Sequence, residues 1–397
     1  MKIADWSVLT TCPGRNYVLV KLVTPDGTVG WGDATLNGRE RAVEATLEHH
    51  VLPEIADRSV DRIEDTWQTL FRHTYWRGGP VLNTALAAVD MALWDIKGKR
   101  YGAPVYDLLG GRTRNGARIY QHCGGENPEA VIDTCTDVLD DGISTLRLRI
   151  DDFVDVEFGT TNVAMLRTKV RDVRAAIGTD PWLILDAHGQ LDPAVAARTA
   201  SALEDLGFLF FEDPTRPEDI DQLSRVREGS TIPLAFGEVY TSPWEYRDLI
   251  ERDLVDYVRP DVVHTGGITA LRKIAILAEH YSVRTAFHAP SDVSPLGFAA
   301  TLHTALSIPN FGIQELPGYL YQDDQSAYQA EYALPVPSQL DTVFSGVPEL
   351  DTDDSVIDID DTPGLGVDID EERAREYDYV REPLPKPRNG DGSVRDW

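Results

Sequence analysis

Three acidic residues in the middle of the chain could together hold a metal ion. Asp186 lies in LILDAHG, Glu212 in LFFEDP and Glu238 in LAFGE, and successive members are 26 residues apart. Each ends a short apolar run, and one strand followed by one helix takes up about this length. Converging carboxylates repel one another, so they stay ionised together only around a cation. Hard oxygen ligands of this kind favour Mg²⁺.

The sequence from residue 117 onward contains the elements that would position such a site. Short apolar runs alternate with amphipathic segments such as 163–177 and 193–206, which is typical of parallel strands joined by helices. We therefore expect an α/β fold whose eight strands close into a barrel, with the carboxylates at its C-terminal mouth. The expected strands are 117–122, 145–150, 182–186, 208–212, 234–238, 257–261, 283–288 and 312–315.

The first 112 residues follow a different, α+β pattern. Two β-rich runs flank Pro25-Asp26-Gly27, a turn sequence in which glycine tolerates positive φ and which predicts a hairpin. Helical patterns follow the hairpin. The expected strands are 17–23 and 29–33, and the expected helices are 39–50, 61–71 and 83–100.

Several motifs resemble the enolase superfamily, and DAH, GEV and a final tryptophan resemble its mannonate dehydratase family in particular. The other motifs are WGDATLNGRE, LNTALAAVDMALWDIKGK, FEDP, VVHTGGITALRKIA, NFGIQE and PGLGVDID. The resemblance implies a modified TIM barrel, (β/α)7β, at 113–321. It implies a capping domain at 1–112 and a tail at 322–397 that returns to this domain and closes the site. It also implies Mg²⁺-dependent dehydration of D-mannonate, D-gluconate or both to 2-keto-3-deoxy-D-gluconate.

The resemblance implies a residue for the general acid, but the tyrosine that it implies for the general base is missing. His188, two residues after Asp186, is the expected acid that protonates the leaving 3-hydroxyl. The family pairs an arginine on the second barrel strand, here Arg147, with a tyrosine in the next loop. The loop at 151–161 reads DDFVDVEFGTT and has no tyrosine, so the base is missing unless Tyr120 or Tyr240 reaches the site.

A second candidate base is a pair of residues at the ends of the sixth and seventh strands. Asp261 and His288 resemble the His–Asp dyad of the mandelate racemase branch, in which the carboxylate fixes the imidazole tautomer. Alternatively, His288 only hydrogen-bonds the substrate carboxylate. Bases on the second and seventh strands approach C2 from opposite faces, so loss of the tyrosine favours D-gluconate or slow turnover of both acids.

The resemblance also implies a set of substrate-binding residues around the same mouth. Each has an ordinary structural alternative, such as an ion pair for Arg259, a helix cap for Glu315 or a free end for Trp397. The expected set is Asn37, His122, Arg259, Asp292, Glu315 and Trp397.

The amino-acid composition of the chain disfavours some classes of binding partner. Lys and Arg total 37 against 66 Asp and Glu, and the net charge of −29 disfavours nucleic acids and anionic membranes. No apolar run is long enough for a membrane helix, and MKIADWSVLT does not resemble a secretory signal, so we expect a cytoplasmic protein. The dispersed acidic excess suggests a halophilic cytoplasm, and the resemblance implies a homo-oligomer.

Two other functions remain open. One is a different reaction of the superfamily, such as epimerisation by Arg147 and Arg149 on the second strand opposite His288. The other is a ligand-binding or sensor protein that keeps the metal site but turns over poorly, which the missing tyrosine motivates.

Overall fold

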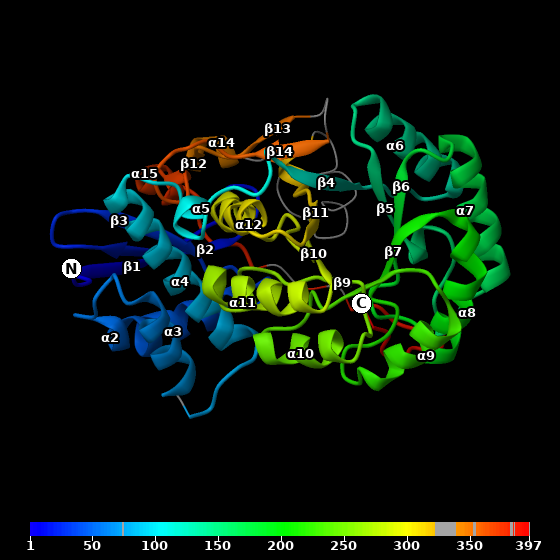
Figure 1. The fold of residues 1–397 in the computed structure, drawn as a ribbon, viewed down its shortest axis with the longest axis horizontal. Coiled ribbons are helices and arrows are strands. Elements are labelled where there is room, and N and C mark those ends of the chain that lie inside the picture. Colours follow the sequence, from blue (N-terminus) through cyan, green and yellow to red (C-terminus); the bar gives the residue numbers. More distant parts are fainter. Residues whose placement is uncertain (74, 322–338, 352–354, 382–383, 385, 397) are drawn as a thin grey trace.

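A computed structural model describes residues 1–397 except 74, 322–338, 352–354, 382–383, 385 and 397. An N-terminal α+β region lies beside a barrel of parallel strands ringed by helices (Figure 1). Among the described residues, no helix is both long and apolar enough to cross a lipid bilayer.

The N-terminal region is built on a three-stranded antiparallel sheet. Strands β2 (Tyr17–Val23) and β3 (Val29–Asp33) form the expected hairpin, and β1 (Asp5–Thr11), which the sequence reading did not include, pairs with β2. Helix α4 (Pro80–Tyr101) packs directly on β3. A Cβ atom at Gly32 would collide with the backbone of Ala88 in α4, so this close contact requires glycine.

The predicted helices of this region are confirmed with changed ends. The segment expected as one helix at 39–50 is α1, a π-helical turn and α2 in succession, and the helix expected at 83–100 begins three residues earlier, at Pro80, which suits a first helical turn. The remaining elements are α1 (Glu40–Thr46), η1 (Leu47–Val51), α2 (Leu52–Ile55), α3 (Ile63–Arg72) and α5 (Val105–Leu108).

The predicted barrel is confirmed. Eight parallel strands, β4 to β11, pair in chain order, and β11 closes the ring on β4. Four strands are shorter than expected: β5 and β10 lose single residues at their ends, Gly237, at φ 119°, ends β8, and β9 ends at Val258. The strands are β4 (Ala117–His122), β5 (Thr145–Arg149), β6 (Trp182–Asp186), β7 (Phe208–Glu212), β8 (Leu234–Phe236), β9 (Tyr257–Val258), β10 (Arg284–Phe287) and β11 (Phe311–Glu315).

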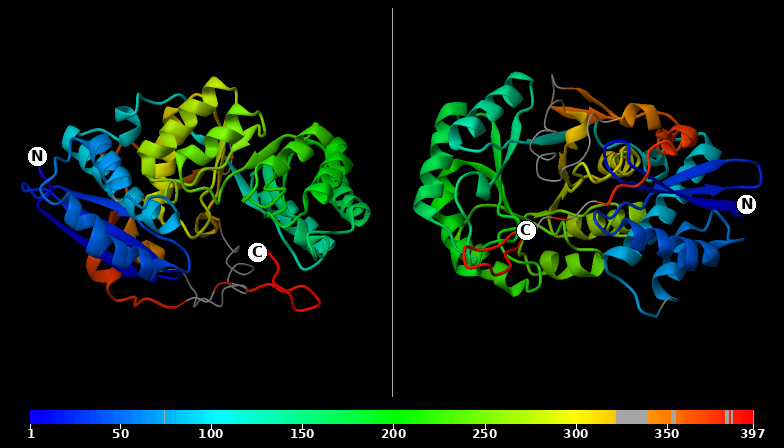
Figure 2. Two further views of the ribbon diagram at one scale, coloured as in Figure 1. Left: turned by 90° about the horizontal axis from the view of Figure 1, so that it is seen from below. Right: turned by 180° about the vertical axis from the view of Figure 1, so that it is seen from behind.

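Helices surround the barrel and cover its outer face (Figure 2). A separate set of buried side chains fills the interior of the ring, so the barrel is a packed core and its open end is the mouth. The interior residues are Tyr120, Ile184, Phe210, Ala235, Ala286 and Ile313. The outer helices are α6 (Pro128–Asp140), α7 (Val163–Ile177), α8 (Pro193–Leu203), α9 (Asp221–Gly229), α10 (Pro243–Glu251), α11 (Gly267–His280) and α12 (Pro295–Ser307), with short η2 (Ile150–Asp152) and η3 (Glu204–Leu206).

The described part of the tail contacts both the barrel and the N-terminal sheet. Strand β14 pairs antiparallel with β4, and the hydroxyl of Thr11 in β1 donates to the carbonyl of Ala374 at 2.7 Å. The short elements are η4 (Gly318–Leu320), α14 (Leu340–Val343), β12 (Phe344–Ser345), β13 (Glu349–Asp351), β14 (Val356–Asp358), β15 (Asp368–Ile369) and α15 (Glu371–Ala374).

Candidate active site

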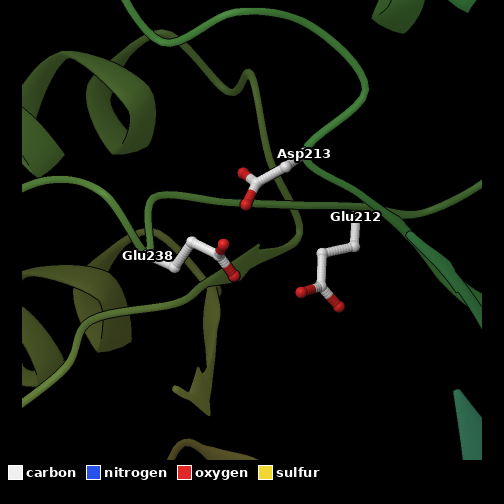
Figure 3. Close-up of side chains that lie close together, drawn as sticks. All are labelled: Glu212, Asp213 and Glu238. Carbon is white, nitrogen blue, oxygen red and sulfur yellow. The ribbon is translucent and has the colours of Figure 1, made fainter. Parts of the chain in front are cut away.

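Three carboxylates lie together at the C-terminal mouth of the barrel. Glu212 ends β7, Asp213 follows it, and Glu238 lies just after β8, two residues beyond Phe236. One oxygen from each lies within 4.8 Å of the others (Figure 3). Two of the three predicted metal ligands, Glu212 and Glu238, are therefore neighbours in the structure.

The site strongly perturbs these acids. Burial and the neighbouring carboxylate of Glu238 raise the pKa of Glu212 to about 7, although two arginines oppose the shift. Burial, Glu238 and Glu212 raise the pKa of Asp213 well above its usual range. Burial would also raise the pKa of Glu238, but His288, His188 and a buried arginine lower it to about 2. Protonation of Glu212 and Asp213 thus reduces the repulsion among the three carboxylates, as a bound cation would also do.

The third predicted ligand, Asp186, is held by other groups. It pairs in register with Glu212 on the neighbouring strand, so its backbone has the expected height. One carboxylate oxygen accepts from the backbone N–H of His188 at 2.6 Å, and the other accepts from the guanidinium of Arg147. Asp186 is therefore outside the close group of three, and its role as a ligand stays a prediction.

Asp213 was missed by the sequence reasoning, although it stands next to Glu212 in the FEDP motif. It adopts φ 35°, an unusual conformation for a residue other than glycine, which turns the chain sharply at the strand end. One of its oxygens accepts from the backbone N–H of Gly237 at 3.2 Å. Asp213 therefore helps to hold the segment that presents Glu238.

His288 and Asp261 form the predicted pair. A parallel bridge joins their backbones, and His288 Nδ1 lies 2.8 Å from Asp261 Oδ2. The other ring nitrogen lies 3.9 Å from a carboxylate oxygen of Glu238. Burial alone would lower the pKa of His288, but the carboxylates of Glu315, Glu238 and Asp261 raise it to about 10.

His188 lies against the same carboxylate. Its Nε2 lies 3.6 Å from Glu238 Oε1, whereas His288 approaches Oε2, so the two histidines contact different oxygens of one side chain. Burial lowers the pKa of His188 to about 4, against the opposing influence of Glu238. His188 also adopts φ 52°, so the loop after β6 holds it in a strained backbone conformation.

One buried arginine forms ion pairs with three acidic residues of the site. Arg259 is only 1% exposed, and its guanidinium lies 2.9 Å from Glu212, 3.4 Å from Glu238 and 3.2 Å from Glu315. Glu315 also contacts His122 Nε2 at 2.7 Å. Arg259 thus supplies the positive charge that offsets part of the acidic group.

A cavity of about 360 Å³ opens above these residues. It is formed jointly by barrel strand ends, by the N-terminal region (Leu36, Asn37 and Pro80) and by Leu384 of the tail. Among the predicted site residues, those lining it are Asn37, His122, Arg147, His188, Glu238, His288, Asp292 and Glu315. Asp186, Glu212, Arg259 and Asp261 are buried, and Trp397 lies outside the described residues.

The cavity is also lined by His264, which the sequence analysis did not name, and by Arg149, which it named only for the alternative of epimerisation. His264 follows β9 in the VVHTGG motif, and its Nδ1 lies 3.1 Å from the hydroxyl of Thr84 in α4, where the N-terminal region meets the barrel. Arg149 ends β5 and forms two hydrogen bonds with Asp151. Each of the two residues lies at or shortly after the C-terminal end of a predicted strand, which was the sequence signal for its place at the barrel mouth.

No tyrosine is among the described residues that line the cavity. The hydroxyl of Tyr120 accepts from Arg259 at 2.8 Å, and the hydroxyl of Tyr240 donates to the carbonyl of Pro217 at 3.2 Å. Burial raises the pKa of Tyr120 well above its usual range. Neither described candidate therefore supplies the tyrosine that the loop at 151–161 lacks.

Comparison with known protein families identifies the superfamily to which this chain belongs. Residues 130–373 match the family described as Enolase C-terminal domain-like. Residues 6–110 match the Mandelate racemase / muconate lactonizing enzyme, N-terminal domain. The chain therefore belongs to the enolase superfamily.

Proteins of similar sequence and structure indicate the family within this superfamily. A D-mannonate dehydratase from Sphingomonas sp. (strain SKA58) is 41% identical over 420 residues, and a D-galactonate dehydratase family member from Chromohalobacter salexigens is 40% identical over 422 residues. Both alignments cover 100% of each chain. An enolase from Pantoea ananatis, solved with D-gluconate and Mg bound, has a TM-score of 0.89 at 33% identity and covers 100% of this chain and 99% of that one. Within the superfamily, this chain is a member of the D-mannonate and D-galactonate dehydratase family.

The raised pKa of Glu212 predicts how metal binding depends on pH. A carboxyl group whose pKa is higher in the folded than in the unfolded protein stabilises the fold below the unfolded value, and this contribution is lost as pH rises through about 7. Protons compete with Mg²⁺ for the same oxygens over that interval. We expect the increase in Tm caused by Mg²⁺ to be small at pH 5.5 and larger at pH 8, measured by differential scanning fluorimetry. An equal increase at both pH values would contradict this prediction.

Proposed function

We propose that this protein is a Mg²⁺-dependent sugar-acid dehydratase that converts D-gluconate, D-mannonate or both to 2-keto-3-deoxy-D-gluconate. One observation carries the proposal: a buried group of carboxylates at the barrel mouth lies between two histidines, His188 and His288, that contact opposite oxygens of Glu238. The fold and the dehydratase relatives support the same class of reaction.

The residues that would hold the metal are Asp186, Glu212 and Glu238, with Asp213 beside them. All offer carboxylate oxygens, the ligands that Mg²⁺ prefers. Both oxygens of Glu212 are buried and accept no hydrogen bond of normal geometry from a described residue, so they are suited to a cation. When bound, Mg²⁺ would hold the substrate carboxylate and stabilise the negative charge that develops as C2 loses its proton.

His288 is the proposed base for the C2 proton. In the neutral ring Nδ1–H donates a hydrogen bond to Asp261, so Nε2 carries the lone pair and lies 3.9 Å from Glu238. The base must be neutral, whereas the surrounding carboxylates favour its protonated form in the metal-free protein. Neutralisation of these carboxylates by ligands in the cavity lowers the pKa of His288 toward the working range of a base.

His188 is the proposed acid for the leaving 3-hydroxyl. It lines the same cavity, on the other oxygen of Glu238, and can therefore reach a different carbon of the substrate from His288. Burial lowers the pKa of His188 to about 4, so the ring is neutral near neutral pH. The negative charge of a bound sugar acid raises its pKa, so it gains the proton it donates after the substrate has bound.

The β5 side of the cavity has Arg147, with His122 beside it, but no described tyrosine. Arg147 donates a hydrogen bond to the carboxylate of Asp186. Proton removal from the His288 face only is therefore proposed, and D-gluconate and D-mannonate differ in configuration at C2. This arrangement favours D-gluconate.

A substrate comparison tests the proposal. Purified protein with Mg²⁺ is expected to dehydrate D-gluconate at least about tenfold faster than D-mannonate, a difference of about 1.4 kcal/mol in barrier height. Because both acids give one product, initial rates are followed by NMR for each acid separately. Equal rates, or faster turnover of D-mannonate, would count against a base on the His288 side.

The same assay separates the alternatives. A rise in Tm with sugar acids but no product supports a binding or sensor protein, which the absence of a described tyrosine at the cavity favours. Recovery of the acid inverted at C2 supports an epimerase that uses Arg147 or Arg149 opposite His288.

We also propose a cytoplasmic, salt-adapted homo-oligomer. The three cysteines are buried and form no disulfide with one another, in keeping with a reducing compartment. The excess of acidic residues keeps a protein hydrated and soluble when salt screens its self-repulsion. Family membership supports oligomerisation, and light scattering at high and low salt would measure it.

A further inference from the structure

The end of the chain lies across the loops at the barrel mouth. A bridge between Arg388 and Val394 folds residues 388–394 into a small hairpin, drawn in red in Figure 2. Leu384, just before it, lines the cavity, and a Cβ atom on Gly38 would touch the side chain of Leu384. Leu384 therefore contacts the N-terminal region and residues 388–396 lie on the barrel, and we refer to Leu384 and residues 386–396 together as the C-terminal strap.

Hydrogen bonds fix the strap to the loop after β5. The side-chain oxygen of Asn389 accepts from the backbone N–H of Phe158 at 3.1 Å, and Glu157 accepts from the backbone N–H of Gly390 at 2.9 Å. Arg395 donates to a backbone carbonyl of the same loop at 3.1 Å. Asn389 is buried, so this contact is part of the packed structure.

A single arginine connects the strap to two further loops. Arg216 follows β7, between Thr215 and Pro217, which both line the cavity. Its Nη1 donates to the carboxylate of Asp192, in the loop after β6, at 2.9 Å, and its Nε donates to the carboxylate of Asp396 in the strap. One guanidinium thus joins three segments of the mouth.

The loop that Arg216 holds through Asp192 is the loop that carries His188. Backbone hydrogen bonds also fix this loop: the N–H groups of Ala187 and Gly189 donate to the carbonyls of Glu212 and Asp213 at 3.1 and 2.8 Å, and the N–H of Asp192 donates to the carbonyl of Gly159 at 2.8 Å. The backbone of His188 is strained, at φ 52°, and such a conformation persists only when its surroundings impose it. The backbone bonds of Ala187 and Gly189 hold His188 on both sides, and the contacts at Asp192, four residues away, hold the far end of the same loop.

We propose that Arg216 is a positioning residue for His188. Through Asp192 and Asp396 it ties the loop after β6 to the C-terminal strap and holds the imidazole where it protonates the leaving hydroxyl. This inference rests on the proposed dehydratase function. Arg216 is itself not placed against the substrate. Its side chain is 34% exposed and its partners 52% and 49%, so the ion pairs add little to global stability and the variants should fold.

The test separates proton removal at C2 from loss of the hydroxyl. In Arg216→Ala, with Mg²⁺ and D-gluconate in D₂O, we expect dehydration to fall about tenfold to a hundredfold, the usual effect of misplacing a catalytic group. Exchange of the C2 proton, which depends on His288, should change less than about twofold on the same reasoning. NMR of the recovered acid and of the product measures both rates, and Arg216→Lys should restore most of the loss.

Arg227→Ala is the matched control. Arg227 also pairs with two acids, Asp253 and Asp256, and is 28% exposed, but Asp256 immediately precedes β9 at the opposite end of the barrel. We expect it to dehydrate and exchange like the wild type. Release of C-terminal residues by a carboxypeptidase gives a readout without turnover, and Arg216→Ala should be digested several-fold faster than either control.

The outcomes are distinguishable. If exchange and dehydration fall together in Arg216→Ala, or if neither changes, the positioning role is overturned. If the wild type itself neither exchanges nor dehydrates any sugar acid, the proposed function fails. In that case equal digestion of Arg216→Ala and wild type overturns the anchoring of the strap as well.

Discussion

Replacement of His288 by asparagine is expected to reduce dehydration of D-gluconate by at least about a thousandfold, within the range attributed to a general base. Asparagine retains a hydrogen-bonding group for a substrate carboxylate but has no nitrogen that accepts a proton at C2. Loss of only the binding function would instead raise KM with little change in kcat. Exchange of the C2 proton with D₂O should disappear together with product formation.

Two variants control for this result. His280→Asn removes an exposed histidine at the end of α11 and should behave like the wild type. Arg147→Met disturbs Asp186 and should slow turnover, yet C2 exchange from the His288 side should remain measurable by NMR. Exchange that survives in His288→Asn and is lost in Arg147→Met would place the base on β5 and contradict our assignment.

Replacement of Glu212 by glutamine should remove both Mg²⁺ binding and activity. The change takes one negative charge from a buried group of acids, and a metal ion contributes several kcal/mol of charge stabilisation, so we expect a loss of more than about a thousandfold. The increase in Tm with Mg²⁺ at pH 8 should also disappear. Without metal, the variant should be as stable as the wild type or more so, because glutamine removes a carboxyl that burial disfavours in its charged form.

Glu279→Gln provides the comparison for charge alone. Glu279 is exposed near the end of α11, so its variant changes the net charge equally but should keep both the Mg²⁺ response and the activity. Full activity of Glu212→Gln, or an unchanged response to Mg²⁺ measured by calorimetry, would disprove the proposed metal site.

Much of the barrel could be predicted because its strands are continuous apolar runs. Strands β4, β6 and β7 begin and end where the sequence predicts, since most of their side chains are buried and each strand ends on a polar residue, His122, Asp186 or Glu212. Strand β1 was missed because its side chains are mostly only partly buried and its sequence, DWSVLTT, lacks a long apolar run. Strand β8 ends early because the positive φ of Gly237 interrupts the ladder.

The candidate site was predictable only as far as it depends on position along a strand. Register alone brings Asp186, Glu212 and Glu238 to one end of the barrel, and the Asp261–His288 contact follows from the same rule. Side-chain partners do not follow from register. The bond from Arg147 to Asp186 depends on which rotamers the two side chains adopt.

Residues from distant segments were the least predictable part. His264 lines the cavity where the N-terminal region packs against the start of α11. Leu384 lines it because the tail, which follows the last barrel strand in the sequence, folds back to the barrel mouth. Such contacts depend on tertiary packing, which a local sequence pattern does not encode.

The two ends of this polypeptide differ in their suitability for fusion to other proteins. The amino group of Met1 pairs with Asp61 within the N-terminal region, and neither residue lines the cavity. Asp396, by contrast, is bound by Arg216 between two cavity-lining residues, so any extension of the carboxyl end starts beside the active site. Affinity tags and reporters therefore belong on the amino end, where they leave the entrance for the sugar acid unobstructed.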